Sequence, residues 1–149
     1  MLARAVMLAA LLVCTACGDD SMSPSEPPAD LTGTWTGQIG TSMSGTAVRF
    51  TWTATQSGST ASGPARLVKP AVGTEIPGTI SATINENQAG LSLSAPAGSV
   101  PTLPACTASG SGSGTIGGNT FAGTFTLTAT GCASIGIENV SGAALLMTR

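Results

Sequence analysis

The sequence predicts an all-β domain, an eight-stranded antiparallel up-and-down barrel, on three observations. Apolar and polar residues alternate with a period of two along several segments, as in strands with one buried face. Threonine fills most of the polar positions, because its branched Cβ suits the pleat while its hydroxyl meets water. Glycine-rich turn signals separate the segments. Eight short strands in series favour a barrel, with a flattened β-sandwich as the alternative.

The alternation is clearest in residues 31–39, 48–55, 76–84 and 121–129. Turn residues cluster at 56–59, 85–90 and 117–119. A small residue or proline followed by glycine recurs at or near the start of each apolar-alternating segment, which predicts eight strands. These glycines are Gly33, Gly45, Gly63, Gly78, Gly90, Gly114, Gly123 and Gly142. The long connection at 95–104 contains three prolines, and we expect a structured surface loop there.

The hairpin around residues 118–119 allows a register to be predicted. A turn at these residues sets Ile116 opposite Phe121 and Gly112 opposite Phe125. Phe125 would then cover the backbone that Gly112 leaves bare, a known way of stabilising glycine within a strand. The sixth strand would point small side chains into the barrel, which leaves room inside it.

The N-terminal residues 1–16 have the features of an export signal. An apolar run at 5–13 follows a basic residue and precedes two small residues, and it is too short to cross a bilayer as a helix. Together with the cysteine that follows, this segment resembles a bacterial lipoprotein signal. The resemblance implies that Cys17 is diacylated and becomes the new N-terminus. Cys14 is the weaker candidate, since the bulky Val13 precedes it.

This resemblance divides the chain into three parts. Residues 1–16 form the signal, and residues 17–30 form the lipidated cysteine and an acidic, proline- and serine-rich tether that we expect to be disordered. Residues 31–149 form the barrel domain, which at about 120 residues is large enough for a core. We expect the protein in a bacterial cell envelope, held by acyl chains on Cys17 to a membrane, the outer membrane on its periplasmic or surface face.

The remaining cysteines form a pair. Once Cys14 leaves with the signal and Cys17 is acylated, Cys106 and Cys132 remain, and an exported compartment permits a disulfide. The hairpin register independently brings Cys106 within one residue of Cys132, so a one-residue bulge would complete the bridge. The closed loop of about 27 residues would contribute about 3.5 kcal/mol. The alternative is two buried free thiols.

Two short motifs resemble known barrel families. Gly33-Thr34-Trp35 resembles the Gly-x-Trp of lipocalins, in which the tryptophan closes one end of the barrel under an arginine of the last strand. This resemblance implies that Arg149 packs across the ring of Trp35. The alternative is that Trp35 is an ordinary core residue and that Arg149 belongs to a frayed C-terminus. The segment 31–40 is also similar to the opening of avidin-type barrels. Biotin binding there needs several further tryptophans, and this domain adds only Trp52.

Charge and composition argue against nucleic acids, cofactors and metals. The chain has a net charge of −2 and no histidine, and its few basic residues are scattered, whereas nucleic-acid binding requires a basic patch. Without histidine and with one cysteine pair, nothing resembles a transition-metal site. The glycine spacing at 112–117 matches a dinucleotide motif, but a turn and a strand follow where the phosphate-binding helix is required. We therefore expect no cofactor and no metal.

Residue combinations that could act in catalysis are equally scarce. The absence of histidine excludes Ser–His and Cys–His nucleophiles. Lys69 has Arg66 rather than a serine three positions before it. The domain's three glutamates, Glu75, Glu86 and Glu138, are widely spaced along the chain, so nothing predicts the paired carboxylates of acid–base chemistry. We expect a protein that is not an enzyme.

Two function classes remain, and both are compatible with a lipid-anchored barrel. The first is a lipocalin-like carrier of a small apolar ligand, with Phe50 and Trp52 as candidate ligand-binding residues. The second is a protein-binding or structural surface lipoprotein whose barrel is filled and whose loops contact an envelope protein. The packing of Phe50 and Trp52 discriminates between them, because a carrier needs these side chains to line an open cavity.

Overall fold

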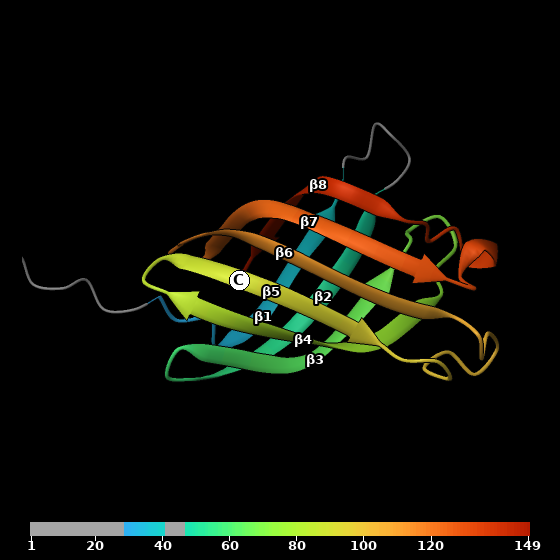
Figure 1. The fold of residues 1–149 in the computed structure, drawn as a ribbon, viewed down its shortest axis with the longest axis horizontal. Helices are drawn as coiled ribbons and strands as arrows, with labels where there is room; N and C mark the ends of the chain where they lie inside the picture. The colour runs from blue at the N-terminus through green and yellow to red at the C-terminus, as the bar shows by residue number, and fades with distance from the viewer. Residues whose placement is uncertain (1–28, 41–46) are drawn as a thin grey trace, which may run out of the picture.

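The computed structural model describes residues 29–40 and 47–149, which form a closed barrel of eight antiparallel strands (Figure 1). Each strand pairs with its neighbours in sequence, and β8 pairs with β1. The predicted barrel is therefore confirmed, and the alternative of a flattened β-sandwich is wrong because the first and last strands are hydrogen-bonded. The strands are β1 Gly33–Ile39, β2 Val48–Ser57, β3 Thr60–Val68, β4 Glu75–Asn85, β5 Gln88–Ala95, β6 Thr107–Gly117, β7 Thr120–Thr130 and β8 Val140–Thr148, with a 3₁₀ turn, η2, at Ala133–Ile135.

The period-two pattern places the apolar residues inside the barrel. Along β2, Val48, Phe50, Trp52 and Ala54 are buried, whereas the residues between them are exposed. Among the described residues no polar or charged side chain is buried. The outer face consists largely of serine and threonine, as expected for strands that meet water on one side. No helix in the described ranges is long and apolar enough to cross a bilayer.

The β6–β7 hairpin has the predicted register. Ile116 pairs with Phe121, and Gly112 pairs with Phe125. A Cβ atom on Gly112 would lie 2.5 Å from Cδ2 of Phe125, and one on Gly114 would lie 2.7 Å from Cζ of Phe121. Phenylalanine rings from β7 therefore occupy the space that the glycines of β6 vacate. The expectation that small side chains leave room in the barrel is wrong for this reason.

The recurring small-residue–glycine pair predicted the right number of strands, although not every position along them. The pair ending at Gly114 lies near the end of β6 instead of near its start. Gly114 is placed by the Phe121 ring that packs on it, not by a turn. The pair ending at Gly45 lies outside the described residues.

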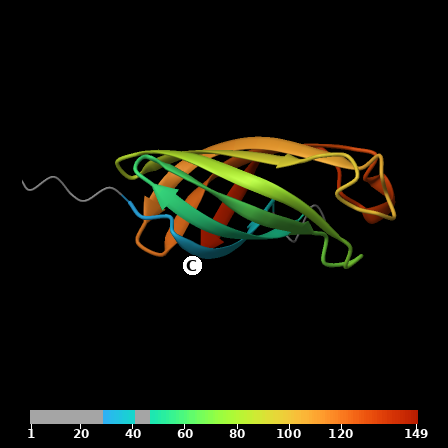
Figure 2. The same cartoon turned by 90° about the horizontal axis from the view of Figure 1, so that it is seen from below.

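The barrel has two unlike ends, which we call the turn pole and the loop pole. The turn pole carries the two-residue turns 58–59, 86–87 and 118–119, and the chain enters β1 there through residues 29–32. The loop pole carries the connections 69–74, 96–106 and 131–139 (Figures 1 and 2). Because successive strands run up and down, alternate connections fall at opposite ends, and the described connections at the loop pole are the longer ones.

Candidate functional site

At the turn pole the structure brings together the two residues predicted to close the barrel. Trp35 is fully buried, and its Nε1 donates a hydrogen bond to the carbonyl oxygen of Leu31 at 2.7 Å. The guanidinium carbon of Arg149 lies 5.3 Å from the centroid of the Trp35 ring, within cation–π range. Gly33 has φ +131°, and a Cβ atom there would lie 2.8 Å from Cδ of Arg149. Glycine at this position thus lets the arginine reach the indole.

Arg149 also binds three backbone or side-chain oxygens around the ring. Its Nη1 donates to the carbonyl oxygens of Asp30 at 3.1 Å and Thr32 at 2.6 Å. Its Nε and Nη2 donate to Oδ1 of Asn119 at 3.3 and 3.1 Å. The Asp30 carboxylate lies 3.8 Å from Nη1. One side chain therefore joins the entrance of β1, the β6–β7 turn and the end of β8.

Gln56 fixes the same segment from the β2 side, and sequence reasoning did not single it out. Its Oε1 accepts a hydrogen bond from the backbone N–H of Leu31 at 2.6 Å. Its Nε2 donates to the carbonyl oxygens of Ala29 and Gly58, both at 3.1 Å. The signal was present: Gln56 continues the inward positions of β2 after Ala54, where the alternation otherwise puts an apolar residue.

The Asp30 carboxylate at this pole has a lowered pKa. The pKa is lowered because the backbone N–H of Thr32 donates to Oδ1 at 2.8 Å, because the Thr32 hydroxyl interacts with it, and because Arg149 is positively charged. All three favour the ionised form.

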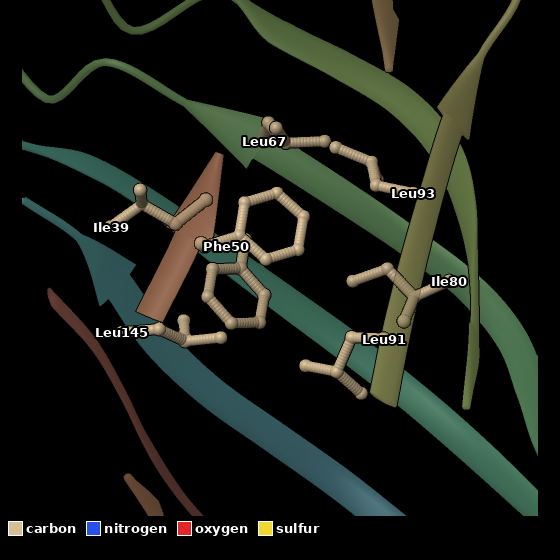
Figure 3. Close-up of a pocket in the computed structure, with 8 residues that line it drawn as sticks. Ile39, Phe50, Leu67, Ile80, Leu91, Leu93 and Leu145 are labelled. Atoms are coloured by element: carbon tan, nitrogen blue, oxygen red, sulfur yellow. The ribbon is translucent and has the colours of Figure 1, made fainter. Parts of the chain in front are cut away.

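The barrel interior contains a small apolar cavity (Figure 3). Figure 3 shows Phe50 facing Leu93 and Ile80 across the remaining space. The volume open to a water-sized sphere is about 10 Å³, close to the least that holds a single water. The lining residues are Ile39, Phe50, Leu67, Ile80, Leu91, Leu93, Phe125 and Leu145.

Trp52 is packed into the core and does not line this cavity. Its side chain is fully buried, on the same face of β2 as Phe50. Its Nε1 finds no hydrogen-bond partner among the described residues, in contrast to that of Trp35. Leaving a buried N–H unpaired costs about 1–3 kcal/mol.

At the loop pole, Cys106 and Cys132 form the predicted disulfide, with their Cα atoms 4.8 Å apart. The β6–β7 ladder ends at the pair Thr107–Thr130, so Cys106 would next face Gly131. Gly131 adopts φ +71°, beyond the ladder. The one-residue offset is thus absorbed at this glycine, and the expected bulge within the paired strands is not needed. The bridge joins the two longest connections of the pole.

These connections pack onto the barrel. Val100, Ile135 and Ile137 are buried in the same apolar core as the strand residues. Within the 96–106 connection, Gly98 N–H donates to the Pro104 carbonyl and Cys106 N–H to the Leu103 carbonyl, each at 2.9 Å. The expectation of a structured loop at 95–104 is confirmed, since its backbone bonds to itself and one side chain anchors it in the core.

Titratable groups are sparse on the described surface. Glu75 forms an exposed ion pair with Arg66, with Oε2 at 2.6 Å from Nη1. Glu86 lies in the β4–β5 turn and Glu138 in the β7–β8 connection, at opposite poles. The described part of the chain holds no cluster of three histidine, cysteine, aspartate or glutamate residues that would suit a metal. Cys17 lies outside the described residues.

The fold and these contacts define a closed eight-stranded antiparallel barrel with an apolar interior, a hydroxyl-rich wall and two distinct poles. Comparison with known protein families, with curated proteins and with solved structures finds no match to this chain.

Proposed function

We propose that this protein is a lipid-anchored, non-enzymatic protein of a bacterial envelope, whose filled barrel is a rigid scaffold that binds another protein through its outer surface. The packing of the interior carries this proposal. Pockets for small molecules usually measure 300–1,000 Å³, whereas the cavity here has about 10 Å³ open to a water-sized sphere. Phe50 and Trp52, the side chains expected to line an open cavity, are both buried in the core.

The compartment is supported by two separate observations. The N-terminal sequence resembles a lipoprotein signal ending at Cys17. The Cys106–Cys132 disulfide is the kind of bond that forms and persists in exported proteins. An anchor and an oxidising compartment together favour the periplasm or the cell surface.

A carrier of a small apolar molecule is the second candidate, and two observations favour it. The cavity lining is wholly apolar and includes Phe50. Trp52 keeps a buried, unpaired N–H on the same interior face, which an acceptor oxygen on a ligand would satisfy.

Native mass spectrometry of the mature protein, isolated from the envelope that made it, separates the two candidates. If the protein is a scaffold, its measured mass should equal that of the polypeptide with its acyl chains. A stoichiometric small-molecule adduct would overturn the filled-scaffold proposal in favour of the carrier. Leu93→Phe, which fills the cavity further, is the matched control, because it should abolish an adduct bound inside the barrel and leave one bound outside.

A further inference from the structure

We propose that residues 29–32 form a strap that closes the turn pole and opens as one unit, with its hinge at Gly33, while the eight-stranded barrel stays closed. The strap is a conformational device, because opening it would uncover the indole N–H of Trp35 and the apolar site that Leu31 fills. It is independent of the scaffold function, since it would act in the same way at the end of a carrier barrel.

The strap is packed onto the end of the barrel. Leu31 is fully buried in the apolar core, and Ala29 is partly buried against that core. The Leu31 carbonyl oxygen accepts the hydrogen bond from Trp35 Nε1 at 2.7 Å, so the strap covers the polar edge of this indole. Lifting residues 29–32 would therefore leave an apolar site and an unpaired N–H open to water.

Two side chains latch the strap to the barrel. Gln56 on β2 accepts a hydrogen bond from Leu31 N–H at 2.6 Å and donates one to the Ala29 carbonyl oxygen at 3.1 Å. Arg149, which follows β8, donates to the carbonyl oxygens of residues 30 and 32. Within the described chain, one backbone–backbone hydrogen bond holds the strap, from Ala29 N–H to the Glu86 carbonyl oxygen at 3.3 Å. Single side-chain bonds thus hold the strap, whereas continuous backbone ladders hold the strands.

Gly33 lies where the strap meets β1 and is suited to be a hinge. Its φ of +131° is a conformation that residues with a side chain rarely adopt, whereas glycine changes its backbone conformation at little steric cost. β1 pairs with β2 from Gly33 onward and with β8 from Thr36 onward. Residues 29–32 precede both ladders and can leave the barrel without breaking either one.

The weak backbone attachment of the strap makes it the element that opens first at this pole. Segments with few backbone hydrogen bonds open at a lower free energy than the ladders they adjoin. Because the strap lies between β1 and the preceding chain, a pull on that chain acts on the latches before it acts on the strands. The strap therefore couples the chain ahead of residue 29 to the exposure of the turn pole.

Hydrogen exchange in the full-length protein, followed by NMR, tests whether the strap opens separately from the barrel. The two tryptophans supply a matched pair of buried indole N–H groups, because that of Trp35 bonds to the strap and that of Trp52 has no partner among the described residues. Relative to free groups, the Trp35 indole N–H and the Leu31 amide should exchange at least about tenfold faster than the Trp52 indole N–H, since local opening lies below global unfolding in free energy. Their exchange should depend little on denaturant, because so short a segment exposes little surface.

Loss of one latch should favour the open strap. Gln56→Ala should speed exchange of the Trp35 indole N–H by about fivefold or more, the factor that corresponds to one hydrogen bond of usual net strength. Gln88→Ala is the matched control, because Gln88 bonds to the hydroxyl of Thr115 on the outer wall, and it should leave the Trp35 rate unchanged.

A change inside the barrel should have the opposite selectivity. A Cβ atom on Gly112 would overlap the Phe125 ring in the β6–β7 hairpin, so Gly112→Ala destabilises the barrel and leaves the strap contacts intact. This variant should speed exchange of the Trp52 indole N–H and leave that of Trp35 unchanged, because the strap opens without disturbing β6.

Three outcomes would overturn the strap. The first is equal protection of the Trp35 and Trp52 indoles with the same dependence on denaturant, or acceleration of both by Gly112→Ala, because Trp35 would then be released only when the barrel unfolds. The second is a fast Leu31 amide beside a Trp35 N–H as protected as that of Trp52, which would mean that residues 29–32 fray and do not open as one unit. The third is an unchanged Trp35 rate in Gln56→Ala, which would show that Gln56 is no latch.

Discussion

Arg149 joins parts of the chain that are more than a hundred residues apart. It stacks on Trp35, bonds to the backbone at Asp30 and Thr32, and bonds to the side chain of Asn119. Strand order explains the first contact, because antiparallel pairing of β1 with β8 brings the start of one beside the end of the other. The contacts to Asn119 depend on where the β6–β7 turn lies relative to that pair.

We expect Trp35 and Arg149 to be energetically coupled. Trp35→Ala should lower the free energy of unfolding by about 3–5 kcal/mol, as for a buried aromatic residue. Arg149→Ala should lower it by about 1–2 kcal/mol through lost stacking and hydrogen bonds. A double-mutant cycle should give a coupling energy well above about 0.5 kcal/mol. The control is a second cycle that combines Trp35→Ala with Arg49→Ala, because Arg49 lies on the outer face of β2. If the losses of unfolding free energy in the Arg149 cycle are simply additive, Trp35 and Arg149 are not in direct contact.

Asp30 should make stability depend on acid pH. Its pKa is lowered in the folded protein from the usual value of 3.8, chiefly by the hydrogen bonds from Thr32. A carboxyl whose folded pKa is the lower one contributes stability above its unfolded pKa and loses that contribution as the pH falls through the folded value. Wild type should therefore be more stable than Asp30→Asn at pH 7, and the difference should shrink below about pH 4. Denaturant titrations at several pH values measure this, and a difference that stays constant down to pH 2 would refute it.

At the scale of elements, the β6 glycines are explained by the rings that cover them. Sequence reasoning predicted that Phe125 lies over Gly112 because a two-residue turn fixes the hairpin register. It did not predict that the same rings also remove the space inside the barrel. Which inward side chains meet across the interior depends on how the strands are staggered around the closed sheet, and no local pattern encodes this.

Gly112→Ala should destabilise the protein by about 1–3 kcal/mol, the usual cost of overpacking a core. The added Cβ would overlap the Thr124 carbonyl and lie 2.5 Å from Phe125 Cδ2. Gly90→Ala is the matched control in β5, because a Cβ there meets nothing within 4 Å, and it should change stability by less than about 1 kcal/mol. Equal effects of the two changes on chemical denaturation would be inconsistent with this packing.

Removing the disulfide by Cys106→Ala/Cys132→Ala should lower the free energy of unfolding by about 3.5 kcal/mol in the chain-entropy model. Hydrogen exchange should accelerate in residues 96–106 and 131–139, because the bridge holds both connections against the core. The turns 58–59 and 118–119 at the other pole serve as internal reference. Unchanged exchange at the loop pole would mean that the buried residues hold the connections without the bridge.

For the whole molecule, the two poles of the barrel carry different parts of the chain. The turn pole holds the chain where it enters β1, and the loop pole carries the longer connections (Figure 2). The proposed membrane anchor requires that the protein be acylated at Cys17.

Cys17→Ser should abolish both metabolic labelling with a fatty-acid analogue and partitioning into membranes. The expectation follows from the apolar run and small residues that precede Cys17, and firm binding requires more than one acyl chain. Cys14→Ser is the control and should label like the wild type. If labelling persists in Cys17→Ser and disappears in Cys14→Ser, the acyl chains are attached at Cys14 instead.

The sequence by itself determined the all-β class, the number of strands, the β6–β7 register and the pairing of Cys106 with Cys132. These follow from a period of two, from turn residues and from counting along one hairpin, all of which are local. Tertiary structure alone decided that the interior is filled, that Gln56 bonds to the entrance of β1, and that Asn119 bonds to Arg149. It also decided that residues 29–32 and the connections 69–74, 96–106 and 131–139 lie at opposite poles. These features arise from contacts between strands far apart in the chain, and closing the sheet is what sets those contacts.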